Sequence, residues 1–376
     1  MKIVVSIDSF KGSLSSMEAG NAVKTAALKL DKNAEIVVKA LADGGEGTVD
    51  ALASGEGAEL IELSVSGPLL KPVLAKYCIL KETNTAVIEM AAAAGITLVT
   101  AEERNPLNTT TFGVGELIKD AIGRGCRRFI VGIGGSATND GGTGMLSALG
   151  FEFLDKSGSP IALGGRGLQN LYSIKNDKVL SELCECSFKI ACDVKNPLCG
   201  ENGCSAVYAP QKGATPEMIR DMDGWLKNFA EISKIVSEKA DENYPGVGAA
   251  GGLGFAFNTF LNSELKSGID IVLEETKLEA DIIDADLVIT GEGRLDSQTI
   301  MGKAPIGVAR LAKRHGKRVI AFSGCVTADA EVINDHGIDA FFPILRSVTT
   351  LDEALDPENA AKNLTATATQ VLRLIF

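Results

Sequence analysis

One recurring pattern constrains the fold of this chain more than any other feature. A short β-branched run is followed by a cluster of glycine and small polar residues, and then by a helical stretch. Uninterrupted apolar runs of this kind suit strands that are buried on both faces, so the pattern predicts a mostly parallel sheet covered by helices. The expected fold class is α/β, with a doubly wound, Rossmann-like domain. The runs are residues 2–7, 35–41, 128–133, 286–290 and 318–322.

Two intervals depart from this pattern. Residues 60–90 alternate polar and apolar side chains, which predicts antiparallel strands, and residues 150–279 mix turn signals with a helix around 215–240. A chain of 376 residues also favours two domains. We therefore expect a second, discontinuous mixed α/β domain inserted into the first. The expected division is residues 1–59, 100–149 and 280–376 for the Rossmann-like domain, and 60–99 and 150–279 for the inserted domain.

The charge and the apolar pattern exclude several classes of partner. A formal net charge of −12 disfavours nucleic acid and anionic membranes, because both would repel such a surface. The apolar run at the N-terminus is too short for a signal peptide, and the stretch 86–99 is interrupted by Glu89 and falls short of a membrane span. We expect a cytoplasmic protein with small-molecule substrates. Its sequence leaves a homo-oligomer open.

The cysteines are the first candidates for a metal site. The chain has eight, and five of them lie close together in the sequence. Their spacing matches no paired Cys-x-x-Cys zinc pattern, so we favour reduced, packed thiols over a metal centre or a disulfide framework. The five are Cys184, Cys186, Cys192, Cys199 and Cys204.

Polar and charged residues follow several of the predicted strands. In an open α/β sheet, ligands bind beyond the carboxyl ends of the strands, so these loops are expected to meet at one edge. Any single loop could be a simple turn, but their convergence favours a site. The residues are Asp8, Ser9 and Lys11, then Asp43 and Glu46, then Ser136, Thr138, Asn139 and Asp140, then Glu292 and Asp296, and finally Lys303, which opens a helix.

The segment 132–144 is the richest in glycine. Glycines let backbone N–H groups approach a ligand, and a following helix N-terminus favours negative charge, so phosphate binding is favoured over a tight turn that uses glycine only for positive φ. Gly132, Gly134 and Ala137 also match a loose dinucleotide fingerprint, with Glu152 at a suitable distance, but that match is weak. No Walker A motif is present, because Gly302 and Lys303 are followed by alanine.

The histidines argue against two common chemistries. His315 and His336 are the two in the chain, and both lie far from the glycine-rich loops in the sequence. A Ser-His-Asp triad or a histidine-dependent dehydrogenase needs an imidazole at the site. Carboxylates, lysines and glycine backbone remain, and these are the materials of phosphoryl transfer with Mg²⁺.

The expected inserted domain carries two further candidate segments. Asp193 follows a predicted strand at 188–191 and is followed by Lys195 and Asn196; an Asx-turn explains it equally well. The glycine run at 245–254 is either a hinge or a loop on the ligand side.

At these segments the sequence resembles the bacterial glycerate kinase family. The matches occur in family order and span nearly the whole chain. The resemblance implies a two-domain α/β fold with the active site in the interdomain cleft, ATP with Mg²⁺ as the phosphoryl donor, and D-glycerate as the acceptor. Its product would be phosphoglycerate, with 2-phosphoglycerate favoured, in glyoxylate or sugar-acid catabolism. The matching segments are 8–12, 42–48, 132–142, 192–198, 248–254 and 290–296.

Roles for individual residues are hypotheses within this resemblance. Asp193 is the first candidate for the base that accepts the hydroxyl proton, and Asp43 is the second. Lys11 and Lys303 would neutralise phosphate oxygens or the glycerate carboxylate, and Arg294 could bind that carboxylate through two N–H groups. Asp8, Glu292 and Asp296 would hold Mg²⁺ directly or through water. The expected substrate- and phosphate-binding residues are Ser9, Gly134, Gly135, Ser136, Thr138, Asn139 and Asn196.

Two other functions compete with this one. A nicotinamide-dependent hydroxy-acid dehydrogenase would explain the glycine-rich turn but not the lysine and carboxylate loops. A non-catalytic protein that binds a small acid would not need so many carboxylates at strand ends, because without a metal they would repel the ligand.

Overall fold

The computed structural model describes residues 1–45, 47–53 and 57–376. Contacts divide the chain into two compact units, which are described separately. Unit 1 comprises Met1–Asp43, Asp50–Glu56 and Ser267–Phe376, and unit 2 comprises Gly44–Val49 and Gly57–Lys266. The chain is a mixed α/β protein in which most strand pairs are parallel, as the sequence predicts.

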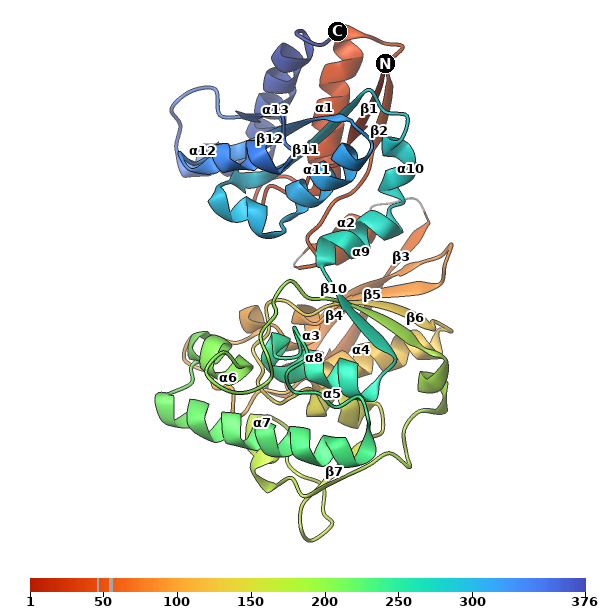
Figure 1. Ribbon diagram of the computed structural model, residues 1–376, viewed down its shortest axis with the longest axis vertical. Coiled ribbons are helices and arrows are strands. Elements are labelled where there is room, and N and C mark those ends of the chain that lie inside the picture. The colour runs from red at the N-terminus through yellow and green to blue at the C-terminus, as the bar shows by residue number, and fades with distance from the viewer. Residues whose placement is uncertain (46, 54–56) are drawn as a thin grey trace. The chain divides into compact units, whose positions relative to one another are not determined.

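Unit 1 is built on a parallel sheet of five strands in the order β13-β12-β11-β1-β2 (Figure 1). Every neighbouring pair in this sheet is parallel. Its strands are β1 (Lys2–Val5), β2 (Glu35–Val38), β11 (Leu287–Leu295), β12 (Arg318–Val326) and β13 (Ala340–Pro343). Its helices are α1 (Ser16–Leu30), α9 (Gly268–Glu275), α10 (Leu278–Ile282), α11 (Ala304–Arg314), α12 (Leu351–Leu355) and α13 (Pro357–Leu372).

The helices α1 and α13 lie side by side on the sheet of unit 1 (Figure 1). The sequence of α1 explains its start, because Ser15 caps the helix and Glu18 returns the hydrogen bond to the backbone of Ser15 in a capping box. Its buried residues, among them Ala19, Val23 and Ala26, recur at helical spacing and pack against β1 and β11. The C-terminal helix α13 packs in the same core.

The strand order of unit 1 reverses between β1 and β11. From β1 the chain moves through α1 to β2 on one side, and from β11 it moves through α11 to β12 and then β13 on the other side. Right-handed crossovers in opposite directions place α1 and α11 on opposite faces, so the sheet is doubly wound. The loops that follow β1 and β11 therefore lie at a topological switch point, where open α/β sheets bind ligands.

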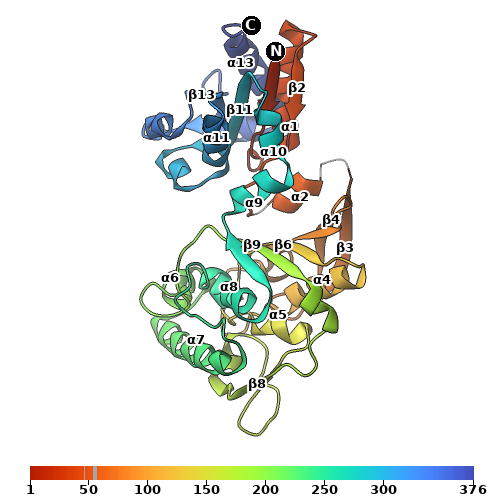
Figure 2. The ribbon, with the colours of Figure 1, turned by 45° about the vertical axis from the view of Figure 1, so that its right-hand side comes forward.

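Unit 2 contains a mixed sheet of six strands in the order β10-β9-β6-β5-β4-β3 (Figure 2). The pairs β3–β4 and β4–β5 are antiparallel, which confirms the prediction for residues 60–90, and the other pairs are parallel. The strands are β3 (Ala58–Ser66), β4 (Pro72–Leu80), β5 (Thr85–Glu89), β6 (Arg128–Gly132), β9 (Ser187–Ala191) and β10 (Ser263–Lys266). A separate antiparallel pair is formed by β7 (Glu152–Leu154) and β8 (Ser173–Lys175).

The helices of unit 2 bury one continuous apolar core against this sheet. Stacked Phe129 and Phe188, whose ring centroids are 4.7 Å apart, mark the centre of the parallel strands β6 and β9. The helices are α3 (Ala91–Ala94), α4 (Phe112–Gly123), α5 (Thr143–Ala148), α6 (Cys204–Tyr208), α7 (Pro216–Val236) and α8 (Ala249–Phe260), and α2 (Thr48–Ala53) spans the boundary between the units in the sequence.

The division of the chain differs from the expected one in several places, of which the following two are the longest. Residues 100–149 were expected in the Rossmann-like domain, but β6 pairs with β5 and β9 in the sheet of unit 2. Residues 267–279 were expected in the inserted domain, but α9 belongs to unit 1. The reason is physical: a buried parallel strand has the same apolar pattern in either sheet, so the pattern does not tell which neighbours the strand will pair with.

The cysteines are free thiols, and their burial varies. Of the five that lie close together in the sequence, Cys186 and Cys204 are buried, Cys192 and Cys199 are partly buried, and Cys184 is exposed. Burial raises the pKa of the Cys192 thiol to about 11, so it is protonated near neutral pH. None of the helices that the structure describes is both long and apolar enough to cross a lipid bilayer.

Candidate functional site

Four acidic residues form a carboxylate cluster at the switch point of unit 1: Asp8, Asp43, Glu292 and Asp296. Asp8 follows β1, and its backbone N–H donates to the carbonyl oxygen of Gly291 in β11 at 2.9 Å. This bond holds the loop after β1 against the strand that carries Glu292. The cluster was predicted from the sequence as separate strand-end residues, and the parallel pairing of β1 with β11 brings two of the loops together.

Asp8 is the most perturbed member of the carboxylate cluster. Its side chain is buried, with 8 % of the residue exposed, and it accepts a hydrogen bond of 2.7 Å from the backbone N–H of Ser9. Burial raises the pKa of Asp8 to about 7, and the negative charges of Asp43 and, to a lesser extent, Glu292 add to this effect. Lys11 acts in the opposite direction. A carboxyl group with this pKa changes charge near neutral pH, which is common at functional sites.

Glu292 lies inside β11 and is also buried. The hydroxyl of Thr299 donates a hydrogen bond of 2.7 Å to its Oε1, and Lys303 Nζ lies 3.5 Å from its Oε2. Burial raises the pKa of Glu292, although Thr299 and Lys303 both lower it. Oε1 of Glu292 is thus held by a short hydrogen bond from Thr299, whereas Oε2 takes part in a longer and weaker ion pair with Lys303.

Asp296 has a structural role in addition to its expected one as a ligand of Mg²⁺. It caps the short 3₁₀ helix η5 (Ser297–Met301), where its carboxylate accepts from the backbone N–H of Gln298 at 3.0 Å. Lys303 Nζ lies 3.5 Å from this carboxylate, and Arg294 Nε lies 3.4 Å from it. Lys303 therefore bridges Glu292 and Asp296, whereas the side chain of Arg294 is largely exposed.

The donor set of the carboxylate cluster suits a magnesium ion that arrives with a nucleotide. In the part of the chain that the structure describes, no group of three or more His, Cys, Asp or Glu side chains is arranged to hold a metal. Mg²⁺ in kinases usually takes only one or two protein carboxylates and completes its shell with phosphate oxygens and water. Asp8 and Glu292 fit this pattern. Both carboxyl groups are buried, and the charge of a neighbouring acid raises the pKa of each, Asp43 and Glu292 for Asp8 and Asp296 for Glu292, so a divalent cation would favour their charged forms.

The remaining residues predicted for unit 1 lie near the same cluster. Asp43 follows β2 and is partly buried, and its charge acts on Asp8. Lys11 is exposed, and its effect on the pKa of Asp8 places it in the same electrostatic environment. Lys303 begins α11 as its N-cap residue, as the sequence predicts. Glu46, which follows the second run in the sequence, lies outside the described residues.

A second group of predicted residues lies in unit 2, in the glycine turn, defined here as residues 132–142 after β6. Gly132 needs to be glycine, because a Cβ there would lie 2.5 Å from the carbonyl oxygen of Gly44. Gly134 and Gly135 are exposed, and Gly135 has a positive φ of 71°. The backbone of these two residues is therefore accessible to a ligand, as phosphate binding requires.

The other half of the glycine turn faces inward. Thr138 and Asn139 are both 0 % exposed. Asn139 Nδ2 donates to the hydroxyl of Ser205 at 2.9 Å, so this amide ties the turn to α6. The expected phosphate donors thus separate into an exposed part, Gly134 and Gly135, and a buried part, Ser136, Thr138 and Asn139, of which Ser136 keeps 8 % of its surface exposed.

Asp140 anchors the end of the glycine turn. Its carboxylate accepts hydrogen bonds from the backbone N–H and hydroxyl of Thr111 at 2.8 and 2.9 Å, and from the backbone N–H of Gly142 at 3.1 Å. Burial raises the pKa of Asp140, whereas these donors lower it. Because several donors point at this side chain, we assign it as a carboxylate that fixes the turn to the start of α4 and α5.

The second glycine run packs directly against the glycine turn. Ala250, Gly251 and Gly252 have positive φ values of 53°, 66° and 90°. A Cβ on Gly251 would lie 2.1 Å from the carbonyl oxygen of Thr138, and the carbonyl oxygen of Gly251 accepts from the backbone N–H of Gly141 at 2.9 Å. The run thus supports the turn from within unit 2, and its two interpretations from the sequence, a hinge or a ligand-side loop, stay predictions.

Asp193 and Asn196 follow β9, at the same edge of the sheet as the glycine turn. Asp193 is exposed. Asn196 is tied into the local structure, because its Oδ1 accepts from the hydroxyl of Tyr208 at 2.7 Å and its Nδ2 donates to the carbonyl oxygen of Asn202 at 2.8 Å. The side chain of Asp193 is on the surface, where a substrate can reach it.

Sequence reasoning missed Lys212. This lysine is 2 % exposed and lies beneath the glycine turn, where its Nζ donates to Ser136 Oγ at 2.8 Å and to the carbonyl oxygen of Thr138 at 2.7 Å. No sequence signal distinguishes it, because a single lysine in a turn is usually a solvated surface residue.

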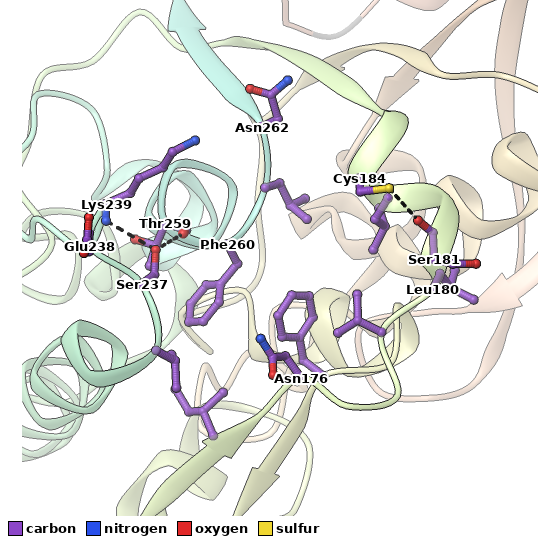
Figure 3. Close-up of a pocket in the computed structure, with 16 residues that line it drawn as sticks. Asn176, Leu180, Ser181, Cys184, Ser237, Glu238, Lys239, Thr259, Phe260 and Asn262 are labelled. Carbon is purple, nitrogen blue, oxygen red and sulfur yellow. Dashed lines mark hydrogen bonds between the residues drawn. The ribbon is translucent and has the colours of Figure 1, made fainter.

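Unit 2 also contains a cavity of about 700 Å³ away from these residues (Figure 3). Phe151 and Phe260 line it edge to face, with ring centroids 5.4 Å apart, and Asn176 and Lys239 also line it. None of the predicted site residues lines this cavity.

Comparisons with known proteins show the family to which this chain belongs. A profile of the glycerate kinase family matches residues 3–376. The chain is 48% identical over 375 residues to a glycerate kinase of Haemophilus influenzae, covering 100% of this chain and 99% of that protein. It is 48% identical over 373 residues to a glycerate 2-kinase of Escherichia coli, covering 98% of each.

A solved structure is similar over the same length. The crystal structure described as "putative glycerate kinase 2 from Salmonella typhimurium LT2" matches with a TM-score of 0.93 and 45% identity, covering 100% of this chain and 98% of that one. Sequence and fold therefore point the same way along the full chain, and the chain belongs to the glycerate kinase family.

Proposed function

We propose that this chain transfers the γ-phosphoryl group of ATP to a hydroxyl group of D-glycerate, with the 2-hydroxyl favoured. The observation that carries the proposal is the carboxylate cluster at the switch point of unit 1, with Lys303 between Glu292 and Asp296, in a member of the glycerate kinase family. The alternatives of a dehydrogenase and a non-catalytic binding protein find no support in the comparisons.

In this proposal the carboxylate cluster holds Mg²⁺. Asp8 and Glu292 supply carboxylate oxygens, and Asp296 binds directly or through water. When bound, the ion would neutralise charge on the β- and γ-phosphates. Thr299 and the backbone N–H of Ser9 hold the two carboxylates in place before the nucleotide arrives. Preorganisation of this kind matters in phosphoryl transfer, where positioning and charge neutralisation do most of the catalysis.

The cations of unit 1 then balance the negative charge of the substrates. Lys303 would move from its 3.5 Å pairs with Glu292 and Asp296 toward a phosphate oxygen or the glycerate carboxylate. Lys11 is exposed and free to reach the same groups. Arg294 is well suited to the glycerate carboxylate, because its guanidinium group is largely exposed and can donate two parallel hydrogen bonds.

The glycine turn of unit 2 would bind phosphate oxygens. Backbone N–H groups of Gly134 and Gly135 and the hydroxyl of Ser136 are the donors we assign to this task. Thr138 and Asn139 contribute by keeping the turn in shape from beneath. Ser9 and Asn196 stay assigned to the substrate side, with Asn196 acting through its backbone and its neighbours.

Asp193 is proposed as the base that accepts the proton of the glycerate hydroxyl, and Asp43 is the second candidate. The support for Asp193 is its exposure and its place after β9 at the edge that carries the glycine turn. The support for Asp43 is its electrostatic contact with Asp8.

We also propose that the enzyme works in the cytoplasm, in the breakdown of glyoxylate or sugar acids. The family resemblance supports the metabolic role. Eight free thiols suit a reducing compartment. A homo-oligomer is compatible with this function and can be measured by light scattering.

The deciding experiment is ADP release by the purified protein with MgATP and D-glycerate, L-glycerate or no acceptor. We expect release that depends on D-glycerate and stops when Mg²⁺ is chelated. Phosphorus NMR of the product then distinguishes 2-phosphoglycerate from 3-phosphoglycerate. ADP release that is the same with and without glycerate would contradict the proposal.

A further inference from the structure

We infer that Lys212 is a positioning residue for the phosphoryl transfer proposed above. Its ammonium group donates to Ser136 Oγ, so that the hydroxyl hydrogen of Ser136 is directed away from Lys212 and can be donated to a phosphate oxygen at the glycine turn. The inference rests on the proposed function, because it requires that the glycine turn binds phosphate. It gives a role to a buried cation that the mechanism has not used.

The contacts of Lys212 are short and specific. Its Nζ donates to Ser136 Oγ at 2.8 Å and to the carbonyl oxygen of Thr138 at 2.7 Å. The lysine comes from a distant part of unit 2, at the end of the 3₁₀ helix η4 (Pro210–Lys212), and it is 76 residues from Ser136 in the sequence. A lysine that is 2 % exposed has few other positions available, so the link is well defined.

The direction of the hydrogen bond to Ser136 is decided by chemistry. An ammonium group has three donors and no acceptor, so Ser136 Oγ must be the acceptor. The hydroxyl of Ser136 keeps its own hydrogen, and that hydrogen cannot point back toward Lys212. Gly134 and Gly135, the accessible residues of the turn, immediately precede Ser136 in the chain. Ser136 is therefore prepared to donate to an anion beside these two glycines.

The charge of Lys212 acts in the same direction. A cation in a poorly solvated interior exerts a stronger field than one in water, and this field favours an anion at the turn. Two titratable groups face Lys212: Asp140, which supports the charged form, and the thiol of Cys204. Burial nevertheless lowers the pKa of Lys212 to about 8, so the ammonium is the main form at neutral pH and is lost in mildly alkaline solution.

The backbone of Lys212 is held as firmly as its side chain. Its N–H donates to the carbonyl oxygen of Ala209 at 3.0 Å, and the next residue, Gly213, has a positive φ of 91°. A Cβ on Gly213 would lie 2.2 Å from the carbonyl oxygen of Arg104. The turn at Gly213, which requires glycine, therefore fixes the backbone position from which the side chain of Lys212 reaches Ser136.

The inference is tested with four variants of the full-length protein. Lys212→Met removes the charge at similar volume, Ser136→Ala removes the hydroxyl, and the double variant combines them. Lys239→Met is the matched control, because Lys239 is an exposed lysine of the same unit at the cavity of Figure 3. Each variant is measured for the dissociation constant of MgADP, for the KM of ATP and of D-glycerate, for kcat, and for the thermal midpoint.

We expect Lys212→Met to weaken MgADP binding and raise the KM of ATP by about tenfold to a hundredfold, the range typical for a lost hydrogen bond to a charged group. Ser136→Ala should weaken binding by a similar factor, because the lysine acts through the serine. The double variant should then be no weaker than either single variant. The KM of D-glycerate and all constants of Lys239→Met should stay close to those of the wild type.

Different results would overturn different statements. If Ser136→Ala weakens MgADP binding but Lys212→Met does not, Lys212 is not a positioning residue and the phosphate site stands. If the two losses multiply in the double variant, Lys212 acts independently of Ser136 and the inference is wrong. If neither substitution changes MgADP binding although the wild type binds it, the glycine turn is not the phosphate site, and that part of the proposed function fails.

A measurement on the wild type covers the case in which Lys212→Met does not fold. MgADP binding is measured between pH 7 and pH 9.5, a range that includes the pKa of Lys212 at about 8 and excludes that of Cys204 at about 12. We expect the wild type to bind more weakly as the ammonium loses its proton, and Ser136→Ala to lose most of this dependence. Equal pH dependence in both proteins would overturn the inference.

Discussion

The hydroxyl of Thr299 donates a hydrogen bond of 2.7 Å to the carboxylate of Glu292, and both residues are buried. The bond closes the loop between β11 and α11, since Thr299 lies in η5 and Glu292 in the strand before it. A buried carboxylate with a fixed donor on one oxygen presents its other oxygen in a defined direction. Lys303, at 3.5 Å from that second oxygen, lies where a phosphate or a magnesium ion would approach.

Replacing Thr299 by valine tests this relationship. The substitution keeps the volume and removes the donor, so the pKa of Glu292 should rise further, because Thr299 lowers it in the wild type. We expect kcat to fall by about tenfold, which corresponds to about 1.4 kcal/mol, and the acid limb of its pH profile to move to higher pH. Thr25→Val, on the exposed face of α1, is the control. An unchanged pH profile would contradict the role given to Glu292.

The ionisation of Asp8 should set the acid limit of the pH range in which the enzyme is active. Its pKa of about 7 means that the carboxylate needed for Mg²⁺ forms as the pH rises through neutrality, so kcat/KM should rise over the same interval. Asp43→Asn removes a charge that raises this pKa, so the limb should move to lower pH. Lys11→Met removes a charge that lowers it, so the limb should move to higher pH. Shifts of the same sign in both variants would contradict the assignment to Asp8.

Asp8 should also reduce the stability of the protein at alkaline pH. Its pKa in the folded state, about 7, lies above the ordinary 3.8, so the folded state binds its proton more tightly than the unfolded state does. The corresponding stability is present below pH 4 and is lost as the pH rises to 7. Asp8→Asn should therefore be more stable than the wild type at pH 8, by on the order of 1–3 kcal/mol, and inactive. Urea unfolding at pH 4.5 and pH 8 measures the difference, which should be smaller at the lower pH.

The local elements of this fold follow from the sequence because their causes are local. The capping box at Ser15 and the apolar residues at helical spacing behind it explain α1 (Ser16–Leu30) through residues that are close in the sequence. Alternation predicts the antiparallel strands β3 and β4. Convergence of the strand-end acids is predictable too, because parallel strands bring their carboxyl ends to one edge.

The structural features that the sequence did not predict correctly are contacts between distant parts of the chain. The strand at 128–132 was expected in the wrong sheet, because its apolar pattern contains no information about its neighbours. Thr138 and Asn139 were expected to face a ligand, but residues in an irregular turn have no periodicity from which to read the direction of a side chain. Lys212 was missed because its burial depends on a contact with a turn 76 residues earlier.

Asp193→Asn tests the proposed base. The amide keeps the shape of the side chain and cannot accept a proton, so kcat should fall by about a hundredfold to ten-thousandfold, the usual contribution of a general base. The KM of ATP should change little. Asp43→Asn, measured under the same conditions, is the comparison, because Asp43 is the second candidate. If Asp193→Asn keeps a near-normal kcat and Asp43→Asn loses it, the base is Asp43.

The contact between the second glycine run and the glycine turn gives the last prediction. Gly251 has a positive φ of 66°, and a Cβ there would lie 2.1 Å from the carbonyl oxygen of Thr138. That oxygen also accepts from the ammonium of Lys212. Gly251→Ala should therefore strain the backbone and displace the turn, lowering the free energy of unfolding by about 2 kcal/mol or more and raising the KM of ATP.

Gly224→Ala is the matched control for this substitution. Gly224 lies inside α7, and no atom lies within 4 Å of the position that a Cβ would take. Alanine is the better helix former, so this variant should be more stable by about 0.5–1 kcal/mol with unchanged kinetics. If Gly251→Ala matches it in stability and in the KM of ATP, the glycine run does not support the turn. A loss of stability with an unchanged KM would separate the two effects and show that the turn tolerates displacement of Thr138.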